Sequence, residues 1–274
     1  IYNDSGTIGN ITGDFIGNYA SATGYEAFGG AIYNADGKIS FSTTEAKKSI
    51  LFENNRVITN AGVAGSEQTK LNSINLVGTS GIINFNTIAN SYINIHDPIT
   101  SLDYQNNRVA QGTINKIGTG SFYLWGDNSE FGGTVNIKEG DFAALFEEAE
   151  DLINDPLGQR KEFKLSNATV NFADGTSFRP MVTDSKIAKL EGTVSVGDNV
   201  KLSPYNVSAL SAGTHTYAVD YSAFEGTTTD LLEVDPSSAS ETKISVKNLA
   251  GYEGMGAAVD AYRKQNLSLD ERII

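Results

Sequence analysis

A short pattern is written twice near the start of the chain, and this repeat constrains the fold more than any other feature. The pattern I-Y-N-x-x-G-x-I begins at Ile1 and returns at Ile32. A second motif, Phe-x-x-Asn, follows each copy, at Phe15–Asn18 and at Phe52–Asn55. The distance between the two motifs differs between the copies, which indicates a fixed strand followed by a loop of variable length. Repeats at intervals of roughly 20–50 residues are typical of solenoids, in which each unit stacks on the next one.

A different five-residue pattern recurs further along the chain. It consists of a small residue, any residue, an apolar residue, a polar residue and usually a second apolar residue, and its copies begin at Gly81, Gly112, Gly133, Ala168 and Gly192. Side chains two positions apart on a strand share one face. We therefore expect Val135 and Val194 to point inward, into a core that runs through successive turns. The Asn of these rungs is either a corner residue or a member of an inward amide ladder.

The composition agrees with many short strands joined by tight turns. The chain has 28 Gly and only 5 Pro, and its apolar residues come in short groups bounded by Gly, Asn and Asp. The sequence therefore predicts an all-β fold, a right-handed single-stranded parallel β-helix, as one elongated domain over residues 1–274.

One segment departs from the strand pattern. In GDFAALFEEAEDLINDP the apolar residues recur at helical spacing, with acidic residues between them. This predicts one amphipathic helical insertion at 141–157, with Asp141 as its N-cap and Pro156 as its stop. We expect its apolar stripe, with Phe146 and Leu152, to pack on the rod, so that Glu147, Glu148, Glu150 and Asp151 face solvent. The alternative is that the stripe faces outward as a partner-binding site. A second, weaker helical pattern covers residues 256–265.

The motifs resemble those of a known group of exported proteins. Gly29-Gly30-Ala31-Ile32, together with the Phe-x-x-Asn motifs, is similar to the repeats of polymorphic outer-membrane proteins and related autotransporter adhesins. The stretch from Gly112 to Gly140 resembles the passenger-associated transport repeat of autotransporters. The matching residues are Lys116, Gly118, Gly120, Gly126, Asn128, Gly132, Gly133 and Gly140.

This resemblance implies a passenger region of type V secretion, displayed at the bacterial cell surface or secreted while tethered to the outer membrane. It implies an outer-membrane barrel C-terminal to this chain, and folding-seed or cap-like turns with the start of a linker at residues 190–266. The expected function is structural and adhesive, with a host-cell surface, an extracellular-matrix component or a second copy as partner. The alternatives are a carbohydrate-active β-helix enzyme and a specific glycan-binding module.

Charge and composition argue against other functions. The formal net charge is −13, which disfavours nucleic acid and anionic membranes, because binding phosphates needs clustered Lys and Arg. Cysteine is absent, which excludes disulfides and thiolate metal sites. There is no apolar run long enough for a transmembrane helix. We expect no catalytic, cofactor-binding or metal-binding residues, and thus no enzyme.

Four positions are candidates for a catalytic, ligand-binding or processing site. Asp4-Ser5-Gly6 is similar to the nucleophile region of trypsin-like proteases, but it lies within the repeat, which favours a turn. His96-Asp97-Pro98 places an imidazole beside a carboxylate, but neighbours on a strand do not converge as a site requires, so a surface turn is favoured. Asp155-Pro156 is either a helix stop or a processing site, and the helix stop is favoured. His215 lies in a strand-like run, facing solvent or packed.

Overall fold

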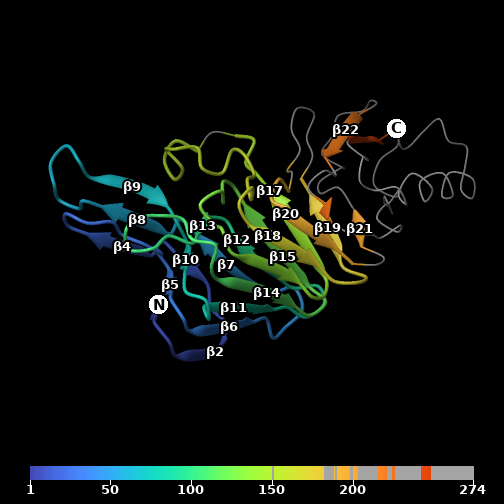
Figure 1. Cartoon of the computed structure of the whole chain (residues 1–274), viewed down its shortest axis with the longest axis horizontal. Helices are drawn as coiled ribbons and strands as arrows, with labels where there is room; N and C mark the ends of the chain where they lie inside the picture. The colour runs from blue at the N-terminus through green and yellow to red at the C-terminus, as the bar shows by residue number, and fades with distance from the viewer. Residues whose placement is uncertain are drawn as a thin grey trace, which may run out of the picture.

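The chain folds as a parallel β-helix, in which short strands from successive turns stack in register (Figure 1). The computed structural model describes residues 1–149, 151–181, 188, 190–197, 200–202, 215–220, 224–225 and 242–247. Every paired strand in these ranges runs parallel to its neighbour, except for one hairpin. The predicted all-β solenoid is therefore confirmed.

The largest sheet has eight strands and contains the recurring five-residue rungs. In spatial order they are β2 (Thr7–Ile11), β6 (Lys38–Ser42), β11 (Ile82–Asn86), β14 (Thr113–Ile117), β16 (Thr134–Ile137), β18 (Thr169–Phe172), β20 (Thr193–Val196) and β23 (Phe224–Glu225). The register aligns equivalent rung positions, so that Val135 pairs with Ile114 on one side and with Val170 on the other. Val135 and Val194 are fully buried, as predicted.

A second sheet of seven strands forms another wall of the helix. Its strands are β21 (Lys201–Leu202), β19 (Ser177–Pro180), β17 (Asp141–Leu145), β15 (Ser121–Trp125), β12 (Tyr92–Ile95), β7 (Ser49–Glu53) and β3 (Phe15–Ile16). A third wall has four strands, β1 (Tyr2–Asn3), β5 (Ile32–Asn34), β10 (Ile74–Leu76) and β13 (Ile99–Thr100). Strands β22 (His215–Asp220) and β24 (Thr242–Lys247) pair separately.

A small sheet projects from the N-terminal turns. It contains β4 (Tyr19–Ala22), β8 (Arg56–Thr59) and β9 (Gln68–Leu71), and it forms the blue to cyan arm in Figure 1. Strands β4 and β8 are parallel, whereas β8 and β9 form the antiparallel hairpin. Because β9 has only one strand neighbour, its outer edge ends this sheet.

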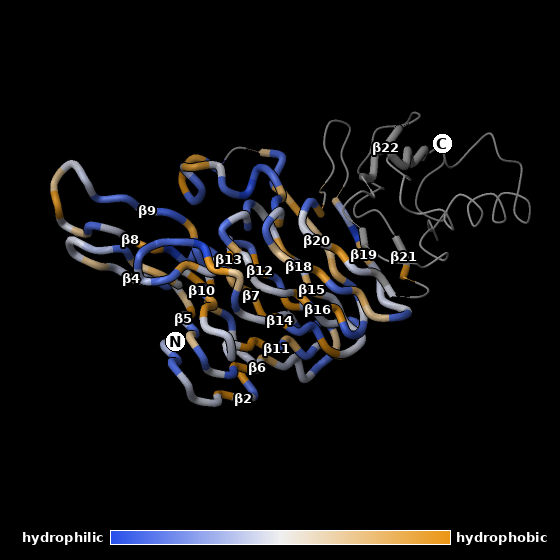
Figure 2. The backbone as a smooth tube through the Cα atoms, viewed as in Figure 1, coloured by the Kyte–Doolittle hydropathy of each residue, from blue (hydrophilic) through white to orange (hydrophobic). Residues whose placement is uncertain are grey.

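The core is a column of aromatic and aliphatic side chains between the walls. Phe41, Phe85, Phe122 and Phe142 are fully buried, and the neighbouring rings along this column have centroids 5.2–5.5 Å apart. Figure 2 shows apolar residues distributed through the stacked strands. Each fully buried large apolar side chain contributes about 1.5–3 kcal/mol, so this column is the main source of stability.

The two N-terminal motifs are stacked copies of one turn. Tyr2 aligns with Tyr33, and their rings stack with centroids 5.3 Å apart. Phe15 aligns with Phe52 in the same manner, at 5.0 Å. Gly29 has a φ of 63°, a backbone conformation that glycine adopts without strain. Each copy of the sequence repeat therefore belongs to one turn of the β-helix, and the two copies stack on each other.

Other asparagines fill the two roles considered, in an inward pair and at corners, whereas the rung asparagines fill neither. Asn3 and Asn34 are buried, and the amide of Asn3 donates to Oδ1 of Asn34 at 2.8 Å. The rung residues form a second ladder on the outer face, from Asn84 through Asn115 and Asn136 to Asn171, with hydrogen bonds of 2.8–3.0 Å. Corner residues with positive φ form the third group: Asn10, Asn54, Asn60, Asn90 and Asn106.

Lys116 is buried within the rod, although it occupies an apolar position of its rung. Its ammonium donates to the carbonyls of Gly118 at 2.5 Å, Glu139 at 2.9 Å and Ile117 at 3.3 Å. Glu139 belongs to the following turn, so this side chain joins two corners. Burial lowers the pKa of Lys116 to about 8. Three carbonyl acceptors replace the water that the ammonium loses.

The predicted helical insertion at 141–157 is wrong. Residues 141–145 form strand β17, in which Phe142 aligns with Phe122, and the described part of 141–157 contains no helix. Asp141 is not an N-cap, because its carboxylate accepts hydrogen bonds from Ser121 and Ser177 of neighbouring strands. Phe146 is buried in the core, whereas Leu152 is 71% exposed. The apolar stripe is therefore divided between core and solvent.

Some predictions concern residues outside the described ranges. These are the helical pattern at 256–265, the start of the linker expected within 254–266, most of the cap-like turns within 190–266, and Glu150. Glu148 is exposed as expected, but Glu147 is partly buried and ion-paired.

Candidate functional site

A long loop leaves the rod after β17 and returns to it before β18. We call residues 147–163 the strap; it is the yellow-green loop in Figure 1. Its returning end is fixed to a corner of the rod. The N–H of Asp127 donates to the carbonyl of Gln159 at 2.7 Å, and the N–H of Glu147 donates to that of Arg160 at 2.8 Å.

The strap is anchored by a buried ion pair. Nη2 of Arg160 lies 2.8 Å from Oδ1 of Asp97, and the two side chains are 2% and 0% exposed. The same nitrogen donates to Oδ1 of Asn54 at 3.0 Å, and Nη1 lies 3.3 Å from Glu147. One guanidinium therefore joins two turns of the rod to the first residue of the strap.

Asp97 is surrounded by hydrogen-bond donors. Its carboxylate accepts the backbone N–H groups of Asn54 at 3.0 Å and Asn55 at 2.8 Å, and the hydroxyl of Ser73 at 2.8 Å. A buried carboxylate needs a counter-ion or hydrogen-bond donors to offset its lost hydration, and Asp97 has both kinds of partner. Its Oδ2 accepts the N–H of Asn55, as Oδ1 of Asn55 accepts the N–H of Asn18 from the turn before.

His96 lies beside this pair, between two carboxylates. Its Nδ1 is 3.5 Å from Glu53 and its Nε2 is 3.4 Å from Glu147, and its ring meets Trp125 edge to face at 4.4 Å. Burial, followed by the charge of Arg160, lowers the pKa of His96 to about 4, although Asp151 acts in the opposite direction. Burial also raises the pKa of Glu147. His96 is therefore neutral at pH 7.

The outer part of the strap is held by two aspartates. Asp155 accepts the backbone N–H groups of Gln159 and Arg160, both at 2.7 Å. Asp151 accepts those of Asn154 and Ile153, and these bonds lower the pKa of its carboxyl group. Such Asx-type turns give the strap a defined shape without a helix.

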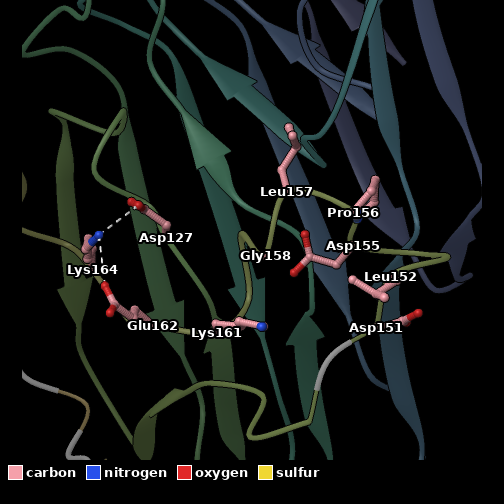
Figure 3. A pocket seen from close by; sticks show the side chains of 10 residues that line it. All are labelled: Asp127, Asp151, Leu152, Asp155, Pro156, Leu157, Gly158, Lys161, Glu162 and Lys164. Atoms are coloured by element: carbon pink, nitrogen blue, oxygen red, sulfur yellow. Dashed lines mark hydrogen bonds and ion pairs between the residues drawn. The ribbon is translucent and has the colours of Figure 1, made fainter.

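A polar pocket of about 410 Å³ lies between the strap and the rod (Figure 3). Lys164 forms ion pairs with two other residues of this pocket. Its Nζ lies 3.4 Å from Oδ2 of Asp127 and 3.1 Å from Oε2 of Glu162. The pocket is lined by Asp127, Asp151, Leu152, Asp155, Pro156, Leu157, Gly158, Lys161, Glu162 and Lys164.

The carboxylates of this pocket are committed to structural contacts. Asp151 and Asp155 close turns of the strap, and Asp127 and Glu162 bind Lys164. A general acid needs a raised pKa and an open path to a substrate. Glu147 has the raised pKa, but it is paired with Arg160 and does not line the pocket.

The described residues contain no group of three or more His, Cys, Asp or Glu side chains that could hold a metal ion. None of them belongs to a helix with the length and apolarity needed to cross a membrane.

The structure tests the local conformation expected at three of the candidate positions. Asp4 and Ser5 lie in an exposed turn closed by Asn3, whose Oδ1 accepts the N–H of Gly6, so the turn interpretation is confirmed. The surface turn expected at His96-Asp97-Pro98 is wrong, because Asp97 is fully buried. The helix stop expected at Pro156 is also wrong, because the described part of the strap contains no helix.

Sequence reasoning missed the residue that organises the site. Arg160 lies 63 residues after Asp97, in a segment that matches no repeat. The available signal was Asp97 itself, an acid two residues after the end of a strand with buried apolar residues. His215 lies in β22, as its strand-like surroundings predicted.

Comparison of the chain with protein-family models, with curated proteins and with solved structures gives no match.

Proposed function

We propose that this chain is a structural and adhesive passenger region of an autotransporter, displayed on the bacterial cell surface. Its partner is a host-cell surface, an extracellular-matrix component or a second copy of the chain. The proposal includes an outer-membrane barrel C-terminal to the chain and assigns no catalytic residue to it.

One observation carries the proposal: the residues of the passenger-like stretch fix consecutive corners of the rod. Lys116 binds carbonyls of two turns. Oδ1 of Asn128 accepts the N–H of Ile99 from the preceding turn at 2.9 Å. A side chain at Gly133 would collide with the carbonyls of Gln111 and Gly112. The motif therefore has a physical reason in a stack of parallel turns.

A parallel β-helix suits export followed by folding outside the cell. Each turn contacts mainly its neighbours, so folding can begin at one turn and propagate along the rod. The core forms without cysteine or metal ligands, which makes folding independent of the redox state outside the cell. A solenoid also presents long loops, such as the strap, away from its core.

The test is surface display. The chain is fused upstream of an autotransporter barrel in a Gram-negative host, and intact cells are probed with antibodies and with protease. We expect labelling of intact cells, together with faster cell settling or attachment to a cultured-cell monolayer. The same fusion with Val135→Asp serves as the control that cannot fold.

Retention of the fusion inside the cell would contradict the export proposal. Display without any attachment or settling would contradict the adhesive role. Turnover of acidic polysaccharides by the purified chain would favour the carbohydrate-active alternative instead.

A further inference from the structure

The outer edge of β9 exposes strand hydrogen-bonding groups. In an antiparallel pair, residues alternately point their N–H and C=O toward and away from the partner strand. The N–H of Arg56 donates to Asn18 on the opposite side, so the facing residue, Leu71, points away from β8. Thr69 lies two residues before Leu71 and points its backbone groups the same way.

Gln159 of the strap already occupies one position on this edge. The N–H of Leu71 donates to Oε1 of Gln159 at 2.7 Å, and Nε2 of Gln159 donates to the carbonyl of Leu71 at 3.1 Å. These two bonds are the pair that one residue of an adjacent strand would make. The side-chain amide therefore imitates a peptide group at Leu71.

An apolar hollow lies beside this edge. It has a volume of about 40 Å³, and its walls include Thr69 and Leu71 on one side and Ile153 and Leu157 on the other. Since one water needs about 10–15 Å³, the hollow suits a small aliphatic side chain. Ile153 is 84% exposed and Leu157 is 64% exposed, and the turns at Asp151 and Asp155 hold them in place.

The hollow also has a positively charged residue in its wall. Arg56 lines the hollow, and its guanidinium makes no ion pair with the described part of the chain. Lys70, by contrast, is bound to Glu130 at 3.0 Å. A carboxylate next to the aliphatic side chain of a ligand would therefore find a partner in Arg56.

We propose that the outer edge of β9 and the facing tip of the strap bind an extended polypeptide segment by strand addition. The ligand's backbone pairs with Thr69 and Leu71, one aliphatic side chain enters the hollow, and a neighbouring acidic side chain meets Arg56. In strand addition the main-chain bonds supply affinity, and side-chain pockets supply specificity.

Gln159 acts as an intramolecular competitor in this scheme. Its backbone stays fixed, because its N–H binds Asp155 and its carbonyl accepts from Asp127. Its side chain therefore has to rotate away before a ligand can pair with Leu71. The same contact covers part of an exposed strand edge, which limits unwanted pairing with other chains.

The experiment measures binding of acetyl-Asp-Val-Thr-Val-Thr-amide to the complete chain by calorimetry and by protection of the Thr69 amide from hydrogen exchange. The comparison ligand is the same peptide with alternate backbone amides methylated, which cannot pair along its edge. We expect the parent peptide to bind and the methylated one to bind at least tenfold more weakly.

Three variants separate the contributions. Gln159→Ala removes the competitor and should tighten binding about tenfold, the effect expected from one or two hydrogen bonds. Thr69→Pro removes an N–H that points away from β8, so the hairpin should fold and peptide binding should be lost. Thr69→Ala changes the side chain alone and should bind as the parent chain does.

Equal binding of the parent and methylated peptides would overturn the proposal, as would absence of binding to Gln159→Ala. These measurements use the isolated chain, so their outcome does not depend on the surface-display test.

Discussion

At the scale of single residues, Asp97 and Arg160 contribute unequally to the buried pair that they form. Asp97 also accepts two backbone N–H groups and a hydroxyl, whereas Nε of Arg160 is buried with no hydrogen-bond partner among the described residues. Loss of the carboxylate therefore leaves more groups unsatisfied than loss of the guanidinium.

We predict that Asp97→Ala lowers the free energy of unfolding by about 3–5 kcal/mol, because it leaves a buried cation and backbone donors without their acceptor. Arg160→Met should cost only about 1–3 kcal/mol, because Asp97 keeps its other donors. Urea denaturation of both variants measures the difference. Equal losses, or a larger loss for Arg160→Met, would contradict this ranking.

His96 predicts a pH dependence. Its pKa is about 4 in the folded chain and 6.5 as the reference value, so the unfolded chain binds more protons between these values. The stability that neutral His96 contributes to the folded chain is complete above pH 6.5 and is lost as the pH falls toward 4. The pKa of Glu147 is raised in the folded chain, so protonation of Glu147 stabilises the folded chain as the pH falls and partly offsets the effect of His96.

The measurement is the melting temperature of the chain and of His96→Gln from pH 7 to pH 4. We expect the stability advantage of the parent over the variant to shrink by about 1–3 kcal/mol across this window, since each pKa unit corresponds to about 1.4 kcal/mol. A constant difference over the whole range would show that folding does not lower the pKa of His96.

The sequence predicted the residues of this site only in part. His96 and Asp97 were recognised as an unusual neighbouring pair, but Asp-Pro indicated a surface turn. Convergence depends on Glu53, Glu147 and Arg160, which come from other turns and carry no periodic signal. Local patterns determine where a turn occurs, whereas these contacts depend on how a non-repeating loop folds back.

At the scale of elements, the rungs offer a matched pair of substitutions. Val135 is fully buried, and its neighbour Thr134 points to the outer face of the same strand. Val135→Asp should lower the free energy of unfolding by several kcal/mol, because an unpaired carboxylate would enter the core. Thr134→Asp should change it by less than about 1 kcal/mol. Thermal unfolding and soluble yield compare the two.

The strands of the rungs were predictable from the sequence because equivalent residues recur in register. The strand β17 was not predictable in this way. Phe142, Leu145 and Phe146 have helical spacing, whereas Phe142, Ala144 and Phe146 have the spacing of a strand, and a short apolar segment allows both. Stacking on Phe122 decides for the strand. Both Ala143 and Leu145 are also buried, so the usual alternation of apolar and polar residues is absent there.

At the scale of the whole molecule, a solenoid is held together mainly by contacts between neighbouring turns. Arg160 and Gln159 add longer connections, since Arg160 reaches Asn54 and Gln159 reaches Leu71. These residues are separated by 106 and 88 positions in the sequence. The strap therefore couples the N-terminal turns and their projecting sheet to turns in the middle of the rod.

This coupling predicts how the chain unfolds. The double variant Arg160→Met, Gln159→Ala should loosen the connection between the N-terminal turns and the rest, because mainly nearest-neighbour contacts and the exposed Lys70–Glu130 ion pair would then connect them. We expect a lower urea m-value, or two transitions where the parent chain has one, since less surface is exposed in each step. Hydrogen exchange of β4, β8 and β9 should become faster before that of β14 and β16. A single transition with an unchanged m-value in the double variant would mean that stacking alone carries the cooperativity.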